Sequence, residues 1–295
     1  MQGLPSFELY SPTSLEDALE FLQSSAEASV MASGTDLLPR VRKRQVSPTV
    51  ILNISALEAE LRYIRRDNGV VHIGALTTVS DLMDSTLFAD RLSLVHEAAQ
   101  IFGAPQIRNM ATVGGNLCSA SSSEDLITVF LALDSQVKLI SSEGERSVPL
   151  RDFVIEKRRT TMKPSEVMSE VCFGYPKENS WTAFEKLGRR NMLIVAMVNE
   201  ALALSLEDDM TTVKSARVAL NRVAGRIPAL AEKTGEFLTG RKLSDETTEK
   251  AQSVLTSELK LTGDFRGSAA YRVEVARAYL KRLIQRCSTN IRGLA

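Results

Sequence analysis

The sequence predicts an α+β protein with two small α/β units, residues 1–57 and 58–177, and a C-terminal domain, residues 178–295, of antiparallel sheet plus a helical bundle. Strand and helix patterns alternate up to about residue 176, which is typical of α/β units. After residue 178, long strand patterns come first and three helical stretches follow as a group. The 295 residues, of which 44% are hydrophobic, are enough for roughly two domains with their own cores.

The first unit is predicted to begin with a short strand that leads into a helix. Thr13 and Glu16 have the spacing of a capping box at the start of that helix. The elements expected in this unit are a strand at residues 7–10, the capped helix, a turn of small residues at 32–36, a short basic helix at 40–44 and a strand at 49–52.

The second unit is predicted to start with a β-hairpin. Residues 61–65 and 70–74 have strand patterns, and Asn68 and Gly69 between them suit the positive φ angles of a tight turn. The elements expected next are a helix capped by Thr78, a helix at residues 92–102 ended by Gly103, a stretch without periodicity at 106–123, a helix at 125–133, and strands at 137–140 and 148–150.

The C-terminal domain is predicted from two long strands, residues 194–206 and 213–220, joined by an acidic turn. Three helices are expected after these strands, at residues 229–238, 244–259 and 268–285.

The charge and the hydrophobic pattern exclude several classes of protein. The 36 Lys and Arg residues offset 36 Asp and Glu residues, so no net charge attracts nucleic acid or an anionic membrane. No apolar run approaches the roughly 18 to 20 residues of a membrane-spanning helix, and the first residues do not resemble a secretion signal. We therefore expect a cytoplasmic protein that binds neither nucleic acid nor membrane.

The cysteines and histidines do not indicate a metal site or a catalytic nucleophile. Cys118, Cys172 and Cys287 lie far apart and lack the spacing typical of zinc or iron–sulfur ligands. His72 falls in a strand pattern and His96 in a helical one, so neither is expected to serve a Ser-His-Asp triad. We expect this chain to contribute no catalytic residue and to bind no metal.

Two segments of small residues, 31–37 and 111–117, interrupt the periodic patterns. Small side chains let a backbone approach a ligand closely, and successive N–H groups in such turns can bind an anion. Hydroxyl and amide groups in or beside these segments can bond phosphate or ribose oxygens. Each segment alone is more often a plain turn, and neither matches the Walker or Rossmann glycine pattern. Taken together, they favour a dinucleotide pyrophosphate held between two loops.

Three segments of the chain resemble one family. The run Gln-Ile-Arg-Asn-Met-Ala-Thr-Val-Gly-Gly-Asn at residues 106–116 is similar to the glycine-rich signature of the FAD-binding, or medium, subunit of molybdenum hydroxylases. This group includes carbon monoxide, xanthine and nicotinate dehydrogenases. Residues 32–39 resemble the first loop of the family, and residues 264–272 resemble its Asp-x-Arg-Gly-Ser-x-x-Tyr-Arg segment near the C-terminus. The resemblance covers essentially the whole chain.

The resemblance implies a PCMH-type FAD-binding region of two α/β subdomains, with the FAD pyrophosphate between the two loops. Asp125 matches an acidic position that contacts the cofactor, Met168 an apolar position beside the flavin, and Lys186 a lysine that contacts the cofactor. From the residues alone, these three would be interpreted as a helix cap, a core residue and a solvated charge. The cofactor-binding residues implied are Met31, Ala32, Ser33, Gly34, Thr35, Asp36, Leu37, Ala111, Thr112, Val113, Gly114, Gly115, Asn116, Ser119, Asp125, Met168 and Lys186.

The sequence departs from the family pattern at several positions. Ser33 replaces the usual middle glycine of the first loop, which would limit positive φ there, and Ser29 stands where many members have a lysine. Ser121 replaces a common aspartate, and Ala111 and Val113 are mild changes. We interpret these as changes in FAD affinity or potential. The chain has no cysteine-bearing insertion for an extra iron–sulfur cluster.

The function implied is electron transfer within a larger complex. Substrate would be hydroxylated at a molybdopterin centre in a large partner subunit, and electrons would pass through iron–sulfur clusters of a small partner to FAD and then to an acceptor such as NAD+. Three alternatives stay open: a stand-alone flavin oxidoreductase with Cys118 as its one candidate covalent anchor, a scaffold subunit without flavin, and a regulatory module that binds a nucleotide.

Overall fold

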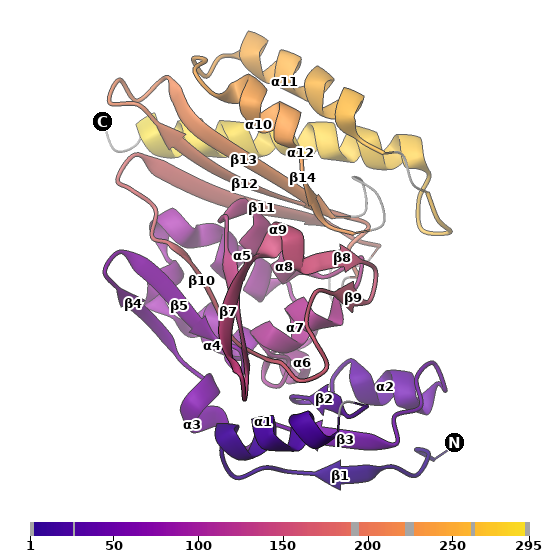
Figure 1. Cartoon of the computed structure of the whole chain (residues 1–295). Coiled ribbons are helices and arrows are strands. Elements are labelled where there is room, and N and C mark those ends of the chain that lie inside the picture. The colour runs from indigo at the N-terminus through magenta and orange to yellow at the C-terminus, as the bar shows by residue number, and fades with distance from the viewer. Residues whose placement is uncertain (1–2, 26, 190–194, 222–226, 261–262, 293–295) are drawn as a thin grey trace.

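The structure is a computed structural model that describes residues 3–25, 27–189, 195–221, 227–260 and 263–292. Its class is α+β, as the sequence predicts: three main sheets and their helices lie in three tiers from the N-terminal unit to the C-terminal helices (Figure 1). No helix within these ranges is long and apolar enough to cross a membrane.

The first tier is a parallel three-stranded sheet of order β1-β3-β2. Its elements are β1 (Glu8–Tyr10), α1 (Leu15–Ser24), β2 (Ser29–Met31), α2 (Leu37–Arg42) and β3 (Val50–Asn53). The hydroxyl of Ser14 caps α1 by accepting a hydrogen bond from the Asp17 N–H at 3.1 Å, so the cap lies one residue after the predicted Thr13. Apolar side chains of α1 and β3 form a small core of their own.

The second tier is an antiparallel five-stranded sheet of order β4-β5-β10-β6-β7. Its strands are β4 (Ile64–Asp67), β5 (Val70–Gly74), β6 (Gln136–Ser141), β7 (Gly144–Pro149) and β10 (Val167–Gly174). Asn68 and Gly69 have φ angles of 48° and 77°, which makes the tight turn predicted between β4 and β5.

Helices cover one face of the second sheet and share its largest apolar core. The helices of this tier are α4 (Val79–Asp84), α5 (Ser93–Gln100), α6 (Pro105–Arg108), α7 (Val113–Ser119), α8 (Asp125–Ala132) and α9 (Leu150–Phe153), with 3-10 turns η1 (Thr86–Phe88) and η2 (Asp90–Leu92) and a hairpin of β8 (Val154–Glu156) and β9 (Arg159–Thr160). The short helix α3 (Glu58–Leu61) precedes them and buries Leu61 in the small core shared with α1. α6 and α7 lie where the sequence shows no periodicity, because each is too short to display one.

The third tier is an antiparallel sheet of order β11-β12-β13-β14 between two layers of helix (Figure 1). Its elements are β11 (Ser180–Leu187), β12 (Val198–Leu206), β13 (Val213–Asn221), β14 (Ala229–Leu230), α10 (Glu232–Leu238), α11 (Asp245–Glu258) and α12 (Ala269–Arg292). One face packs on the three helices through residues such as Leu202 and Leu280. Ala201 and Ala219 on the other face join the core of the second tier, so the two tiers are continuous.

The third tier differs from the sequence prediction at its strands. β11 was not predicted as a separate strand, and β14 occupies the start of the stretch predicted as a helix from residue 229. The predicted strand at 194–206 begins at Val198 in the structure, and residue 194 lies outside the described residues. The predicted helix at 268–285 is longer than expected, because α12 continues to Arg292.

Candidate functional site

A cavity of about 610 Å³ lies between the first and second tiers. Both segments of small residues contribute to its wall, although they are far apart in the sequence. This volume is within the range of pockets that hold cofactors. The lining residues are Ala28, Ser29, Val30, Met31, Ala32, Ser33, Gly34, Thr35, Asp36, Leu37, Arg40, Phe102, Ile107, Ala111, Thr112, Gly115, Asn116, Cys118, Ser119, Glu124, Met162, Lys163, Pro164 and Glu166.

The first loop, residues 32–36, connects β2 to α2 and turns at Gly34. Gly34 has a φ of 75°, a left-handed conformation that favours glycine, and a Cβ atom there would lie 2.8 Å from Cδ1 of the Leu38 side chain, which would have to shift. Ser33 is not among the described residues with positive φ. The limit that serine places on positive φ at position 33 therefore does not affect this loop, because the left-handed conformation falls on Gly34.

The second loop leads into α7, and its two glycines have different surroundings. The Gly114 N–H donates to the Ala75 carbonyl at 2.8 Å, and a Cβ atom on Gly114 would lie 2.7 Å from the Ala75 Cβ. Gly114 and Val113 are therefore buried against the neighbouring chain and do not line the cavity. Gly115 lines the cavity, and its N–H donates to the Thr112 hydroxyl at 3.1 Å.

Asn116 provides a test of whether this cavity fits a ligand rich in hydroxyl groups. Its side chain is 7% exposed and lines the cavity. Its Oδ1 atom is buried and has no hydrogen-bond partner among the described residues. A buried acceptor without a partner costs about 1 to 3 kcal/mol, which a ligand hydroxyl would offset. Together with the exposed backbone at Gly115, this acceptor fits the sugar and phosphate portion of FAD.

Glu124 lines the same cavity, although the sequence reasoning did not select it. The Ser119 hydroxyl donates to its carboxylate at 2.6 Å, and the Asn116 amide donates to its other oxygen. Burial raises the pKa of Glu124 to about 7, and the charges of Asp125 and Asp36 act in the same direction. An ionisable group that titrates near neutrality therefore lies in the wall of the cavity.

Arg158 joins the two tiers across one end of the cavity wall. Its guanidinium forms two hydrogen bonds with the Asp36 carboxylate, at 2.8 and 3.0 Å, and a third with the Ser119 carbonyl at 3.1 Å. Its backbone N–H donates to the Ala120 carbonyl at 2.8 Å. The sequence reasoning also missed Arg158, whose only signal is the run of three basic residues at 157–159.

Asp125 and Lys186 lie together, but outside the cavity wall. The Lys186 ammonium is 2.5 Å from the Asp125 carboxylate, and their side chains are 1% and 5% exposed. The Asn199 amide donates to the other Asp125 oxygen at 2.6 Å, and the Thr128 hydroxyl donates to Asn199 at 2.9 Å. Burial raises the pKa of Asp125, although the charge of Lys186 acts against that shift. These four residues form a buried polar network between α8 and the C-terminal sheet.

Met168 and Cys118 complete the set of residues selected from the sequence. Met168 is 3% exposed on β10 and packs in the core of the second tier, outside the cavity lining. Cys118 lines the cavity, but burial raises the pKa of its thiol to about 12. A thiol with that pKa is not a nucleophile at neutral pH, so Cys118 is unsuited to anchor a flavin covalently.

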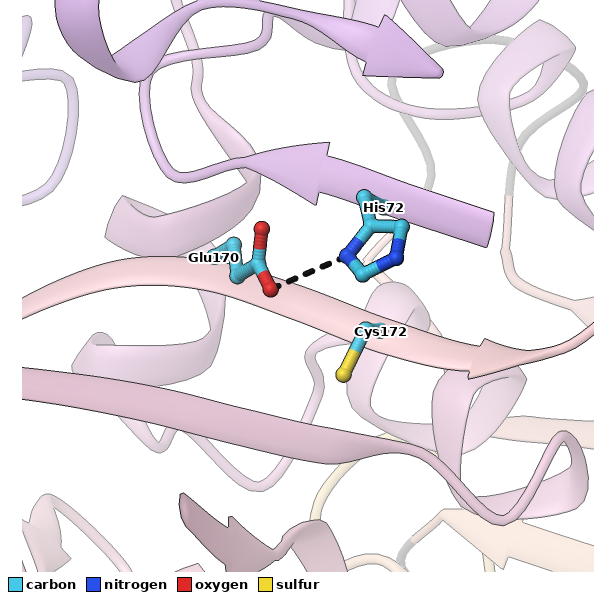
Figure 2. Close-up of side chains that lie close together, drawn as sticks. All are labelled: His72, Glu170 and Cys172. Carbon is cyan, nitrogen blue, oxygen red and sulfur yellow. Dashed lines mark hydrogen bonds and ion pairs between the residues drawn. The ribbon is translucent and has the colours of Figure 1, made fainter. Parts of the chain in front are cut away.

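His72 lies close to Glu170 and Cys172 on the second sheet (Figure 2). By strand alternation these side chains are on the face opposite Ile73 and Val171, which pack in the core with α5 and α8. The imidazole Nδ1 is 3.0 Å from the Glu170 carboxylate, the Tyr63 hydroxyl donates to that carboxylate at 2.8 Å, and the Lys138 ammonium is 3.6 Å away. Burial raises the pKa of Glu170, but these hydrogen bonds and the charge of Lys138 outweigh it and lower the pKa overall. The carboxylate is thus balanced by protein groups, and we assign no metal to this cluster.

Comparisons with known proteins match both halves of the chain to domains of molybdenum hydroxylase flavoproteins. A family model described as the FAD binding domain in molybdopterin dehydrogenase matches residues 5–175, and one described as the CO dehydrogenase flavoprotein C-terminal domain matches residues 182–287. The nicotinate dehydrogenase FAD-subunit of Eubacterium barkeri is 32% identical over 286 residues, which covers 95% of each chain. The carbon monoxide dehydrogenase medium chain of Hydrogenophaga pseudoflava is 30% identical and covers 95% of this chain and 96% of the relative. A crystal structure of the cyanide-inactivated Cu,Mo-CO dehydrogenase superimposes with a TM-score of 0.91 at 28% identity, covering 98% of this chain and 99% of that chain.

Proposed function

The chain belongs to the family of FAD-binding medium subunits of molybdenum hydroxylases, and on that basis we propose that it relays electrons through an FAD held in the cavity between its two loops. Members of the family are subunits of oxidoreductase complexes, and another subunit of each complex oxidises the substrate. Passage of electrons from the iron–sulfur clusters of a partner to FAD is general to these complexes. We further propose that an acceptor such as NAD+ receives the electrons from FAD.

One observation carries the proposal: the two loops and the unpartnered Asn116 Oδ1 line a single cavity. The backbones at Gly34 and Gly115 leave room for close approach by a phosphate, and the hydroxyls of Ser33 and Thr35 supply donors. Apolar side chains, among them Phe102, line the same cavity.

Five of the residues selected from the sequence do not line the cavity, and we propose that they act on FAD binding indirectly. Val113 and Gly114 would act through the backbone position that they give to Gly115 and Asn116. Asp125, Lys186 and Met168 lie behind the wall, and we propose that they support the site from there. FAD supplies the electron-transfer chemistry when bound, so no side chain of this chain needs to act as a general acid or base.

The proposed partners are a small iron–sulfur subunit and a large molybdenum subunit. Ile101, Ile107 and Met110 are 37%, 40% and 52% exposed, and they lie around α6, beside the cavity that Ile107 lines. Exposed apolar residues that gather at one place are typical of a protein interface. We propose that this surface faces the iron–sulfur subunit, because it brings a partner next to the cavity.

Flavin retention by glycine variants tests the proposed site. Gly115→Val places a branched side chain on the cavity wall, with its Cβ 2.8 Å from the Thr112 Oγ1 that also lines the cavity, and we expect it to abolish FAD retention in a folded chain. Gly174→Val is the matched control, because Gly174 lies at the end of β10 with nothing within 4 Å of an added Cβ. Chromatography of the supernatant from denatured protein measures the FAD content. Equal FAD content in the two folded variants would contradict the site, and a wild-type chain that takes up no FAD would favour the scaffold alternative.

A further inference from the structure

Glu124 occupies an unusual place for a carboxylate, because it lies in the wall of a cavity that we propose holds a pyrophosphate. Its two hydrogen-bond donors, Ser119 and Asn116, are themselves among the residues proposed to serve FAD. An ionised Glu124 therefore competes with the phosphates for these donors and adds like charge to the site. A neutral Glu124 removes the repulsion and offers an O–H donor in its place.

We propose that FAD binding is coupled to the uptake of one proton by Glu124, so that the neutral carboxyl belongs to the cofactor-bound state. The inference rests on the proposed FAD site. The proton comes from solvent and stays on the Glu124 carboxyl while the cofactor is bound. Glu124 is thus a determinant of how tightly the chain holds FAD at a given pH.

The charges that face Glu124 from neighbouring elements do not provide a dedicated counter-ion. Arg158, between β8 and β9, faces Glu124, and its charge lowers the pKa of that carboxyl but does not outweigh burial. The guanidinium forms its bidentate pair with Asp36 at the start of α2 instead, and Asp36 also has Arg40 at 3.5 Å. Asp125 on α8 is paired with Lys186.

The segment before β10 contributes Lys163 and Glu166 to the cavity wall, and Glu166 is paired with Arg146 of β7 at 2.6 Å. Neighbouring acids thus have partners of their own, whereas the contacts of Glu124 within this wall are hydrogen bonds from uncharged groups.

The sign of the effect follows from proton linkage. Burial raises the pKa of Glu124 to about 7 in the free chain, and a nearby dianionic pyrophosphate raises it further. The bound state then holds more protons than the free state at pH values above 7, so the affinity falls as the pH rises. Between the free and the bound pKa values, the Kd for FAD increases about tenfold per pH unit. Below pH 6 the affinity no longer depends on this group.

The test is a titration of the flavin-free full chain with FAD at several pH values between 6 and 9, followed by flavin fluorescence. We expect the Kd of the wild-type chain to rise through this range and the Kd of Glu124→Gln to stay level. Glu156→Gln is the matched control: Glu156 is an exposed residue of β8 that pairs with Arg159 and does not line the cavity, so its variant keeps the wild-type pH dependence.

Calorimetry gives a second measurement that needs no variant. Titration of the wild-type chain with FAD at pH 8, in two buffers of different ionisation enthalpy, counts the protons taken up per FAD bound. About one proton supports the inference. No uptake, or an affinity for FAD that is level or rises between pH 6 and 9, overturns it while leaving the FAD site intact. A folded chain that binds no FAD even at pH 6 overturns the FAD site itself.

Discussion

Replacement of Lys186 by methionine removes one half of the most deeply buried ion pair next to the proposed site. Methionine has a similar length, so the packing is kept while the charge is lost. Asp125 would keep the hydrogen bond from Asn199 at 2.6 Å, but its carboxylate, 5% exposed, would have no counter-ion. Removing one partner of a buried pair costs about 3 to 5 kcal/mol. Because one strong hydrogen bond remains, we expect a loss of about 3 kcal/mol.

The pH dependence of Lys186→Met gives the prediction a second signature. Burial already places the pKa of folded Asp125 above its value in the unfolded chain, and loss of the lysine raises it further. The folded variant then binds a proton that the unfolded chain does not, so its stability increases as the pH falls through the folded pKa. The destabilisation relative to the wild type is therefore largest at pH values above the folded pKa of Asp125 in the variant, and it becomes smaller as the pH falls through that pKa.

Thermal unfolding followed by circular dichroism measures both effects. A loss of about 3 kcal/mol corresponds to a decrease in Tm of about 6 to 12 °C for a cooperatively unfolding domain of roughly 150 to 250 residues. The double variant Asp125→Asn, Lys186→Met removes both charges and keeps an acceptor for Asn199, so we expect it to recover most of the lost stability. A single variant that melts with the wild type, or a double variant as unstable as the single one, would refute this account of the pair.

Three other variants or reactions test separate parts of the site. Arg158→Gln is expected to change the free energy of unfolding by less than about 1 kcal/mol, because Asp36 and Arg158 are 39% and 29% exposed. Because the variant loosens the cavity wall, we expect stopped-flow measurements to show faster release of FAD. Gly114→Val is expected to lower the urea midpoint by forcing a side chain against Ala75, at a cost of about 1 to 3 kcal/mol or more; an unchanged midpoint would mean that the close packing there is not required. Iodoacetamide at pH 8 is expected to leave Cys118 unmodified in the native chain and to modify it in urea, because its thiol has a pKa of about 12; rapid native labelling found by mass spectrometry would disprove this.

The parts of the fold that the sequence predicts are those with local signals. Asn68 and Gly69 marked the hairpin, and small residues marked both loops of the cavity, because their backbone requirements are visible one residue at a time. β11 was missed because its alternation of polar and apolar residues covers only residues 180–183 and is broken at Phe184, where the strand is buried on both faces. Short helices such as α7 end before a helical period can be seen.

The parts of the site that sequence reasoning missed depend on contacts between distant segments. Arg158 reaches Asp36 across 122 residues, and nothing beside either residue indicates the other. Glu124 looks like an ordinary acidic residue before a helix until Asn116 and Ser119 are placed against it. Asp125 and Lys186 were selected only through the family resemblance, and their pairing with each other became visible only in the structure.

If the cavity between the two loops holds FAD as the electron relay of a molybdenum hydroxylase, the flavin and the metals should purify together. The measurement is the visible spectrum and the metal content of the chain purified from its host together with whatever accompanies it. We expect stoichiometric FAD in this chain, with molybdenum and iron in the partner subunits. A folded, colourless chain that takes up no added FAD would contradict an FAD site in this cavity.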